Sequence, residues 1–317
     1  MKTIHSIEPL SQSQLSNIIS KTGVEVTLID RNSFLEQREE HPRVNTLICR
    51  DRDNISDIIE VCNNLKLLFV VSTGVERLPF EKLAERNITV CNTGGINAEI
   101  MSQYVMAYIL AQKTRVYENY KNQIRHYWKK YQSVESLVDS NLLIVGAGKI
   151  GQNITSKAVQ YGINCIGIKK HVKSLPYFDE VVSLKALDEK LSSADYVVCT
   201  MPSTPYTKKI FDYDRFCAMK ETALFINISR GNLVVTEDLI KALNKRKISA
   251  AVLDVFEDEP LTVNNNLWDI PNLFITPHSS GRLEDFLDKA IECFIHNYKA
   301  FVSEATIPNK VNLSDGY

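Results

Sequence analysis

The feature that most constrains the fold of this chain is a glycine-rich loop between an apolar strand and a helix. Residues 142–145 have the pattern of a strand, residues 146–151 read GAGKIG, and a helical pattern continues to residue 161. In such a loop, the glycines permit a tight turn, let backbone N–H groups approach a pyrophosphate and allow close packing of the helix, whose positive end favours the phosphate. The pattern predicts a dinucleotide site that contains Gly146, Gly148, Lys149, Ile150 and Gly151.

Short apolar strands alternate with helical segments along most of the chain. A chain of 317 residues exceeds the usual size of a single hydrophobic core, so we expect two domains. Buried strands separated by helices predict an α/β fold with parallel, doubly wound sheets and a Rossmann cofactor domain. The strands are expected at 25–29, 46–49, 67–71 and 88–91 in the first half, and at 142–145, 164–168, 196–200, 224–228, 250–255 and 273–276 in the second half.

Two long helices set the expected domain boundaries. One is predicted from residue 97 to about residue 116, where apolar residues recur at helical spacing and the chain could pass from one domain to the other. The other is predicted at 283–302 and could pack back onto the first domain. We therefore expect a discontinuous substrate domain of residues 1–100 plus 287–317 and a dinucleotide-binding domain of residues 101–286.

Basic residues occupy the position that selects between the two nicotinamide cofactors. Enzymes that use NAD carry an acidic side chain after the second strand, where it binds the ribose hydroxyls. Here Lys169 stands 18 residues after Gly151, followed by Lys170, His171 and Lys173. Cationic side chains would bind a 2′-phosphate that a carboxylate would repel, so NADPH is the expected cofactor. A solvated basic turn with relaxed cofactor choice, in which NAD also serves, is the alternative.

Three later strands each end in polar or ionisable residues. The segments contain Arg230 in NISRG, Glu259 in LDVFEDEP and His278 in TPHSSG. Ligands of open α/β sheets bind at the carboxyl ends of the strands, so these side chains could converge on one crevice. An arginine for the substrate, a histidine as proton donor and a carboxylate to orient that histidine are what the reduction of a carbonyl group requires.

With the glycine loop, these motifs resemble the D-isomer-specific 2-hydroxyacid dehydrogenases over essentially the whole chain. Two further stretches are similar to that family: STGVE at 72–76 resembles its substrate-carboxylate loop, and MPSTPYT at 201–207 resembles its cofactor loop. The resemblance implies a flavodoxin-like substrate domain, a cleft between the two domains, and an oxidoreductase that transfers a hydride between NAD(P)H and C2 of a small 2-keto or 2-hydroxy acid. The basic run, with Gln123 and Trp128, looks most like the glyoxylate/hydroxypyruvate reductase branch.

The resemblance also implies roles for individual residues. Arg230, Glu259 and His278 would be the catalytic residues, and Thr73, Gly74 and Arg230 would bind the substrate. A homodimer is expected from the family. Besides the glycine loop, Lys169 and Lys170, the residues expected at the cofactor are Met201, Pro202, Thr207, Ile228, Ser229, Arg230, Asp254 and His278. The sequence departs from the family pattern at two places, with Ser102-Gln103 in place of Ala-Glu and Glu76 in place of Asp. These departures leave the identity of the substrate acid open.

Composition excludes several other classes of protein. The formal net charge is −1, which gives no indication of a nucleic-acid or membrane partner. No secretory signal is visible, and the longest apolar candidate has eight residues, short of the roughly 18 to 20 that span a bilayer. The seven cysteines form no CxxC pair or other ligand spacing, so we expect reduced thiols, no metal and a place in the cytoplasm.

One alternative of a different class stays open on sequence grounds. The same fold serves NAD(P)H-sensing binding proteins and corepressors, and these can retain the Arg, Glu and His. A formate dehydrogenase is disfavoured, because such an enzyme would be expected to have Gln as the partner of the histidine, where this chain has Glu259.

Overall fold

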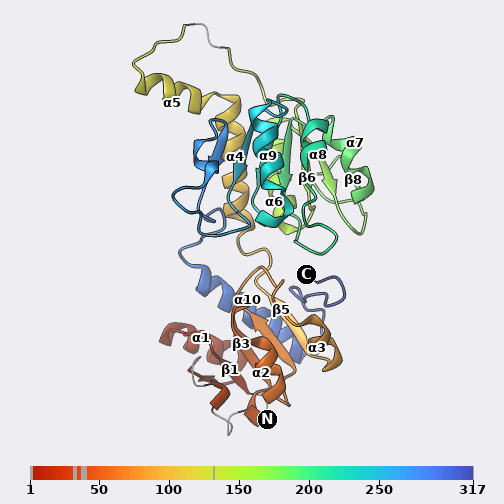
Figure 1. Ribbon diagram of the computed structural model, residues 1–317. Coiled ribbons are helices and arrows are strands. Elements are labelled where there is room, and N and C mark those ends of the chain that lie inside the picture. The colour runs from red at the N-terminus through yellow and green to blue at the C-terminus, as the bar shows by residue number, and fades with distance from the viewer. Residues whose placement is uncertain (1–2, 31–33, 37–40, 131–132, 317) are drawn as a thin grey trace. The chain divides into compact units, whose positions relative to one another are not determined.

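The computed structural model describes residues 3–30, 34–36, 41–130 and 133–316 and divides the chain into two compact units. The first unit contains Met1–Ile96 and Leu283–Tyr317, and the second contains Asn97–Arg282. The C-terminal helix α10 (Phe286–Val302), blue in Figure 1, therefore lies among the red and orange N-terminal elements. The boundaries expected from the sequence each lie four residues later than these.

The described strands of the first unit form a five-stranded parallel sheet with the order β2-β1-β3-β4-β5. This order is that of flavodoxin-like folds, as predicted. The strands are β1 (Ile4–Ser6), β2 (Val26–Leu28), β3 (Thr46–Cys49), β4 (Leu67–Val70) and β5 (Thr89–Asn92), and the helices are α1 (Gln12–Thr22), α2 (Ile55–Val61), α3 (Phe80–Glu85) and α10. The sequence predicted β2 to β5 to within one residue at each end. It missed β1, because Ile-His-Ser carries no apolar run although all three residues are buried.

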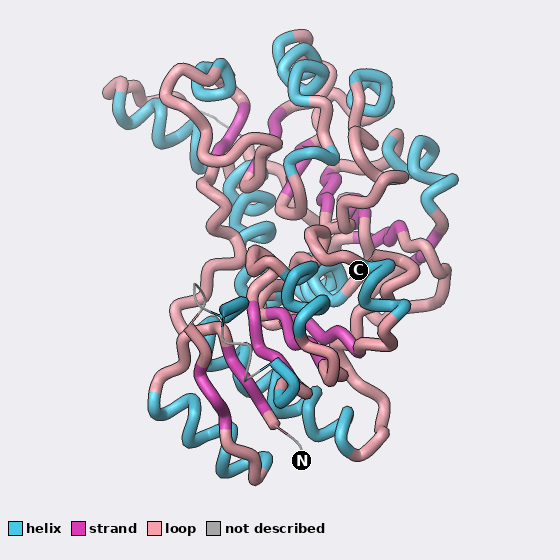
Figure 2. The backbone as a smooth tube through the Cα atoms, turned by 60° about the horizontal axis from the view of Figure 1, so that its bottom comes forward, coloured by secondary structure: helices cyan, strands magenta, loops and turns pink. Residues whose placement is uncertain are grey.

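Both faces of the central strands β3 and β4 are buried under helices, which is why these strands are largely apolar. Successive side chains point to opposite faces: Leu47 packs in the cluster with α2 and α3, whereas Ile48 packs in the cluster with α1 and α10. Figure 2 shows these magenta strands lying side by side between the cyan helices of the unit. The sheet is therefore fixed from both sides, and its carboxyl edge carries the loops discussed below.

The second unit is a seven-stranded parallel sheet, counted over its described residues, with the order β12-β11-β10-β9-β6-β7-β8. The order reverses at β6, the strand before the glycine loop, as in a Rossmann fold. The strands are β6 (Asn141–Val145), β7 (Asn164–Ile168), β8 (Glu180–Val182), β9 (Tyr196–Cys199), β10 (Leu224–Asn227), β11 (Ala250–Leu253) and β12 (Leu273–Ile275). The helices are α4 (Ala98–Lys113), α5 (Val116–Ile124), α6 (Lys149–Ala158), α7 (Leu187–Leu191), α8 (Tyr213–Ala218) and α9 (Thr236–Asn244).

The central strand of the second unit is buried on both faces. Leu142 and Ile144 pack with α4 and α6 on one face, whereas Leu143 and Val145 pack with α7, α8 and α9 on the other. Six strands were predicted, and the seventh, β8, was missed because Glu180-Val-Val is short, half exposed and opens with a charge.

The prediction of one long helix over 97–116 was wrong in its detail. Helix α4 ends at Lys113, and a second helix, α5, begins at Val116. Between them Arg115 has φ +57°, a left-handed conformation that interrupts the right-handed helix. In Figure 1, α5 lies at the far end of α4, and none of its residues is fully buried, although Tyr117 packs on Phe274 of β12. No described helix is long and apolar enough to cross a membrane.

Candidate active site

The glycine loop lies at the carboxyl end of β6, directly before α6. Gly146 has φ +115°, and a Cβ at this position would lie 2.5 Å from the backbone nitrogen of Met201, so only glycine fits. A Cβ on Gly151 would lie 2.7 Å from Ile144 Cγ2, which shows how closely α6 packs on the strand. At Gly148 a Cβ would meet nothing closer than 3.9 Å. The backbone at Gly148, directly before α6, is therefore not crowded, as the approach of a pyrophosphate requires.

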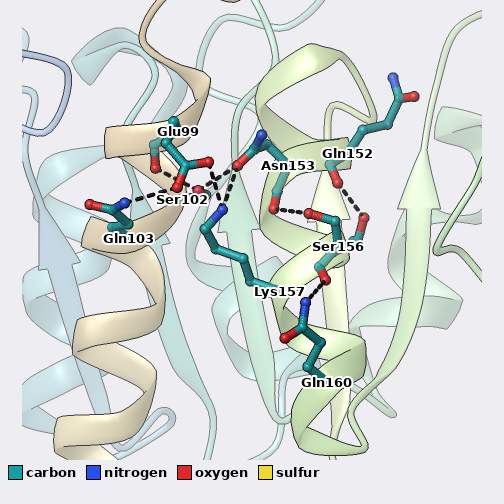
Figure 3. Close-up of polar contacts among 9 residues, drawn as sticks. Glu99, Ser102, Gln103, Gln152, Asn153, Ser156, Lys157 and Gln160 are labelled. Carbon is teal, nitrogen blue, oxygen red and sulfur yellow. Dashed lines mark hydrogen bonds and ion pairs between the residues drawn. The ribbon is translucent and has the colours of Figure 1, made fainter.

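Helix α6 is anchored to α4 by polar contacts (Figure 3). The buried Ser102 hydroxyl lies 2.6 Å from Asn153 Oδ1, and Lys157 Nζ donates to Glu99 Oε2 at 2.8 Å and to Asn153 Oδ1 at 3.0 Å. Gln103 donates to Glu99 at 2.9 Å. The Ser-Gln departure from the family pattern is therefore accommodated by a hydrogen-bonded contact between the two helices.

The basic residues after β7 lie at the rim of this loop. The Nζ of Lys169 donates to the carbonyl oxygen of Ala147 within the loop at 3.1 Å. Burial, and secondarily the charge of Lys173, lower the pKa of Lys169. Lys170 and His171 are exposed. No carboxylate follows β7 before residue 179, so the position of the ribose-binding acid is held by cations.

The cofactor-loop segment at 201–207 is fixed by its own side chains. Thr207 uses its hydroxyl within the loop, where it accepts from the N–H of Thr204 at 2.8 Å and donates to the carbonyl of Pro202 at 2.8 Å. The Ser229 hydroxyl donates to the carbonyl of Met201, which joins the ends of β9 and β10. Ile228 is buried beside them.

Glu259 and His278 are in direct contact. Glu259 Oε2 lies 2.8 Å from His278 Nδ1, and the other oxygen of the carboxylate accepts the N–H of Phe256 at 2.9 Å. The side chain of His278 is 54% exposed, so its Nε2 side is open to a ligand. Of the three neighbouring acids at 257–259, Glu259 is the one in contact with the histidine.

Arg230 follows β10, the strand beside β11. Its guanidinium donates to the carbonyl of Ser229 at 2.7 Å, and Asn227 Nδ2 donates to the carbonyl of Arg230 at 2.9 Å. A Cβ on Gly231 would lie 1.9 Å from the carbonyl carbon of Phe256. Only glycine allows this approach, which places the loop with Arg230 against the loop with Glu259.

Asp254 is fully buried directly after β11. Its Oδ1 accepts from the Thr276 hydroxyl at 2.6 Å and from the N–H of Ser279 at 2.8 Å, and its Oδ2 accepts from the N–H of Ser280 at 3.0 Å. The carboxylate, expected at the cofactor, is thus largely engaged by the turn that carries His278.

Thr73 and Gly74 belong to the first unit and follow β4. Asn92 Nδ2 donates to the carbonyl of Thr73 at 2.9 Å, and Asn92 Oδ1 accepts the N–H of Gly94 at 3.0 Å. Among described residues, the N–H groups of Thr73 and Gly74 have no hydrogen-bond partner. The sequence analysis missed Asn92, whose only local signal is an amide at the end of a strand.

The described residues provide no alternative centre based on a metal or a disulfide. No group of three His, Cys, Asp or Glu side chains among them could hold a metal ion. All seven cysteines are free thiols.

The second unit is thus a dinucleotide-binding α/β domain with an acid–imidazole pair at the carboxyl edge of its sheet. Comparison with known proteins gives the family. Residues 106–280 match the family model described as D-isomer specific 2-hydroxyacid dehydrogenase, NAD binding domain. The chain belongs to this family, which confirms the prediction of an NAD(P)-dependent 2-hydroxyacid dehydrogenase fold and class.

The chain is also similar to two curated relatives and to one solved structure. Glyoxylate/hydroxypyruvate reductase B of Escherichia fergusonii is 30% identical over 261 residues, which are 80% of each chain. D-3-phosphoglycerate dehydrogenase of Methanocaldococcus jannaschii is 27% identical over 311 residues, which are 96% of this chain but only 58% of the relative. An NADPH-dependent glyoxylate/hydroxypyruvate reductase of Sinorhizobium meliloti, solved with NADP and sulfate, shares the fold with a TM-score of 0.83 at 22% identity, over 100% of both chains.

Proposed function

We propose that this protein is an NADPH-using oxidoreductase that reduces a small 2-keto acid to its 2-hydroxy acid, or catalyses the reverse. The observation that carries the proposal is the 2.8 Å contact between Glu259 and His278, whose imidazole is otherwise half exposed. A histidine oriented by a carboxylate is the arrangement that donates a proton to a carbonyl oxygen as it becomes an alkoxide. Reduction of small acids such as glyoxylate or hydroxypyruvate fits the names of the relatives.

The open glycine loop fits a dinucleotide, and the cation beside it fits a 2′-phosphate. Gly146, Gly148, Lys149, Ile150 and Gly151 would hold the pyrophosphate at the N-terminus of α6, where the helix dipole favours an anion. Lys169 and Lys170 would bind the phosphate that distinguishes NADPH from NADH. The segments at 201–207 and 228–229 would line the remainder of the cofactor, and when bound the nicotinamide supplies the hydride.

The remaining site residues act on the substrate. The N–H groups of Thr73 and Gly74 would bind its carboxylate. The guanidinium of Arg230 would bind both the carboxylate and the carbonyl oxygen through its planar fork, which lysine lacks. The Nε2 of His278 would give its proton to the growing alkoxide, while Glu259 on Nδ1 stabilises the imidazolium that must form before each turnover.

We also propose that the working form is a homodimer joined through α5 and the residues after it. Large apolar side chains are exposed here: Trp128 is 87% exposed and Ile124 is 63% exposed, and Val116, Tyr120 and Tyr127 are each more than half exposed. A helix that fully buries none of its residues in its own chain is stabilised by burying its exposed apolar face against a partner. A second copy of this chain presents the same face and is the partner that a C2 interface requires.

The function is tested by following NADPH oxidation against a panel of 2-keto acids. His278→Ala should reduce turnover by about 10² or more while NADPH binding stays within about twofold, because general acid catalysis typically contributes 10² to 10⁴. Retention of more than about a tenth of the rate in His278→Ala would contradict the proposed role. If the protein binds NADPH and reduces no acid on the panel, a sensing or corepressor function replaces the enzymatic one.

A further inference from the structure

A hydrogen-bonded chain of side chains runs from helix α4 to the turn that carries His278. The hydroxyl of Tyr104, on α4, lies 2.6 Å from Thr276 Oγ1, directly after β12. Thr276 Oγ1 in turn lies 2.6 Å from Asp254 Oδ1, directly after β11. Tyr104 and Thr276 are 172 residues apart in the sequence. None of the family motifs in the sequence includes Tyr104.

The donor of each hydrogen bond between Tyr104, Thr276 and Asp254 can be assigned from the chemistry of the groups. The Asp254 carboxylate accepts from the N–H groups of Ser279 and Ser280, so its third contact, with Thr276, is also to a donor. The Thr276 hydroxyl has a single proton, and that proton points to Asp254. Its oxygen therefore accepts from Tyr104, which is the donor at the far end. Burial strongly raises the pKa of Tyr104, which keeps the phenol protonated for this role.

The series of hydrogen-bonded side chains ends at a strained part of the backbone. His278 has φ +52°, in the left-handed region that a non-glycine residue adopts only when its surroundings fix it there. Its N–H donates to the carbonyl of Asp254 at 2.9 Å, while the carboxylate of Asp254 accepts the next two N–H groups of the turn. Asp254 therefore holds the turn on both sides of His278, and the Thr276 hydroxyl helps to orient its carboxylate.

Tyr104, Thr276 and Asp254 can affect His278 only by fixing the position of its backbone. The Nδ1 of the imidazole is paired with Glu259, so the chain reaches the backbone of the turn and not the ring. The Tyr104 ring is itself fixed, since it packs on Tyr108 with ring centroids 4.9 Å apart, and Tyr108 packs on Phe274 of β12 at 6.0 Å. A fixed ring on α4 thus helps to hold the Thr276 hydroxyl, and through it the Asp254 carboxylate, in place.

We propose that Tyr104 and Thr276 are positioning residues for the proton donor: through Asp254 they hold the His278 turn in the conformation in which the imidazole contacts Glu259. The proposal deepens the proposed function and rests on it for the role of His278. It assigns to Asp254 a structural task besides the contact with the cofactor that the family resemblance implies.

Four variants test the hydrogen bonds between Tyr104, Thr276 and Asp254. Tyr104→Phe removes the donor, Thr276→Val removes the central hydroxyl, and Thr276→Ser keeps that hydroxyl. Tyr117→Phe is the matched control, because Tyr117 packs on Phe274 in the same aromatic cluster, with ring centroids 4.2 Å apart, but has no contact with Thr276 among the described residues. Each variant is purified as the full chain and compared for kcat, KM of the keto acid, Kd of NADPH and melting temperature.

The expected result is a loss in kcat alone. Displacing a reacting group by a fraction of an ångström costs less than the 10² of a 1 Å error, so kcat should fall about 3- to 10-fold in Tyr104→Phe and about 10- to 50-fold in Thr276→Val. Thr276→Ser should restore kcat to within about twofold, and KM, Kd and the control should change by less than about twofold. If Tyr104→Phe behaves like Tyr117→Phe, or if Kd of NADPH weakens as much as kcat falls, the proposal is overturned.

A readout that needs no turnover separates this proposal from the proposed function. The ring signals of His278, assigned in NMR spectra by their absence in His278→Ala, should move in Tyr104→Phe and in Thr276→Val but not in Tyr117→Phe. If the wild-type chain reduces no keto acid, the proposed function fails, and these signals still decide the positioning role. Unchanged His278 signals in both variants overturn it. Should Thr276→Val fail to fold, the signals in Tyr104→Phe, compared with those in Thr276→Ser, decide the positioning role instead.

Discussion

Glu259→Gln is the most informative single substitution at the site, because it changes the charge beside His278 and almost nothing else. In the wild-type chain one carboxylate oxygen accepts the N–H of Phe256 and the other faces His278 Nδ1 at 2.8 Å. The amide oxygen of the introduced glutamine would keep the bond to Phe256, so its NH2 group would face Nδ1. A donor facing Nδ1 favours the neutral imidazole in which Nδ1 accepts, and the protonated ring loses its partner.

The expected magnitude follows from the exposure of the pair. A hydrogen bond to a charged group contributes about 1.5 to 3 kcal/mol. Because His278 is 54% and Glu259 33% exposed, solvent screening places this pair at the lower end, about 1.5 to 2 kcal/mol. If that stabilisation belongs to the transition state, kcat for keto-acid reduction falls about 10- to 30-fold.

The assay is initial-rate NADPH oxidation at saturating keto acid, with Kd of NADPH measured separately. Glu257→Gln is the control, since Glu257 is an exposed acid on the same loop without a contact to the histidine among the described residues. It should stay within about twofold of wild type, as surface substitutions usually do. An unchanged kcat in Glu259→Gln, or an equal loss in Glu257→Gln, would refute the pairing of Glu259 with the proton donor.

Three further outcomes are expected. Lys169→Asp should move cofactor preference from NADPH towards NADH, because a carboxylate would repel the 2′-phosphate; tighter NADH than NADPH binding in the wild type, measured by fluorescence titration, would contradict this. Asn92→Ala removes the hydrogen bond to the carbonyl of Thr73 in the proposed carboxylate loop, worth about 1 kcal/mol, so KM of the keto acid should rise about 5-fold with Kd of NADPH unchanged. Ile124→Glu should yield a folded monomer by light scattering if α5 forms the dimer interface, because Ile124 is 63% exposed in the single chain; a dimer that persists would exclude this interface.

Much of the fold follows from local patterns. Strands buried on both faces are largely apolar, and this is why β3, β4 and β10 could be located from their apolar runs. Strands β1 and β8 could not be located, because three-residue segments with His, Ser or Glu carry too little pattern. The end of α4 was missed for another reason: the left-handed Arg115 interrupts a sequence whose apolar spacing alone would continue the helix.

The motif residues of the site were predictable by type, but their contacts were not. The sequence offers three neighbouring acids at 257–259, and it is the backbone of the loop, through the N–H of Phe256, that aims Glu259 at His278. Two further contacts depend on which strands are neighbours in the sheet. They are the close approach of Gly231 to Phe256 and the hydrogen bond from Asn92 to Thr73. Pairings of this kind are set by the order of strands in the sheet.

Asp254 shows why residue type alone leaves a role undetermined. An acid at the end of a strand beside a cofactor domain is naturally read as a ligand of the cofactor. In the structure this carboxylate is fully buried and accepts three hydrogen bonds from the turn around His278. A buried carboxylate needs such donors to offset the loss of its hydration, and once they are present it fixes the backbone that provides them. Two of these donors are N–H groups of the turn, so the charge that makes Asp254 costly to bury also holds His278 in its left-handed conformation.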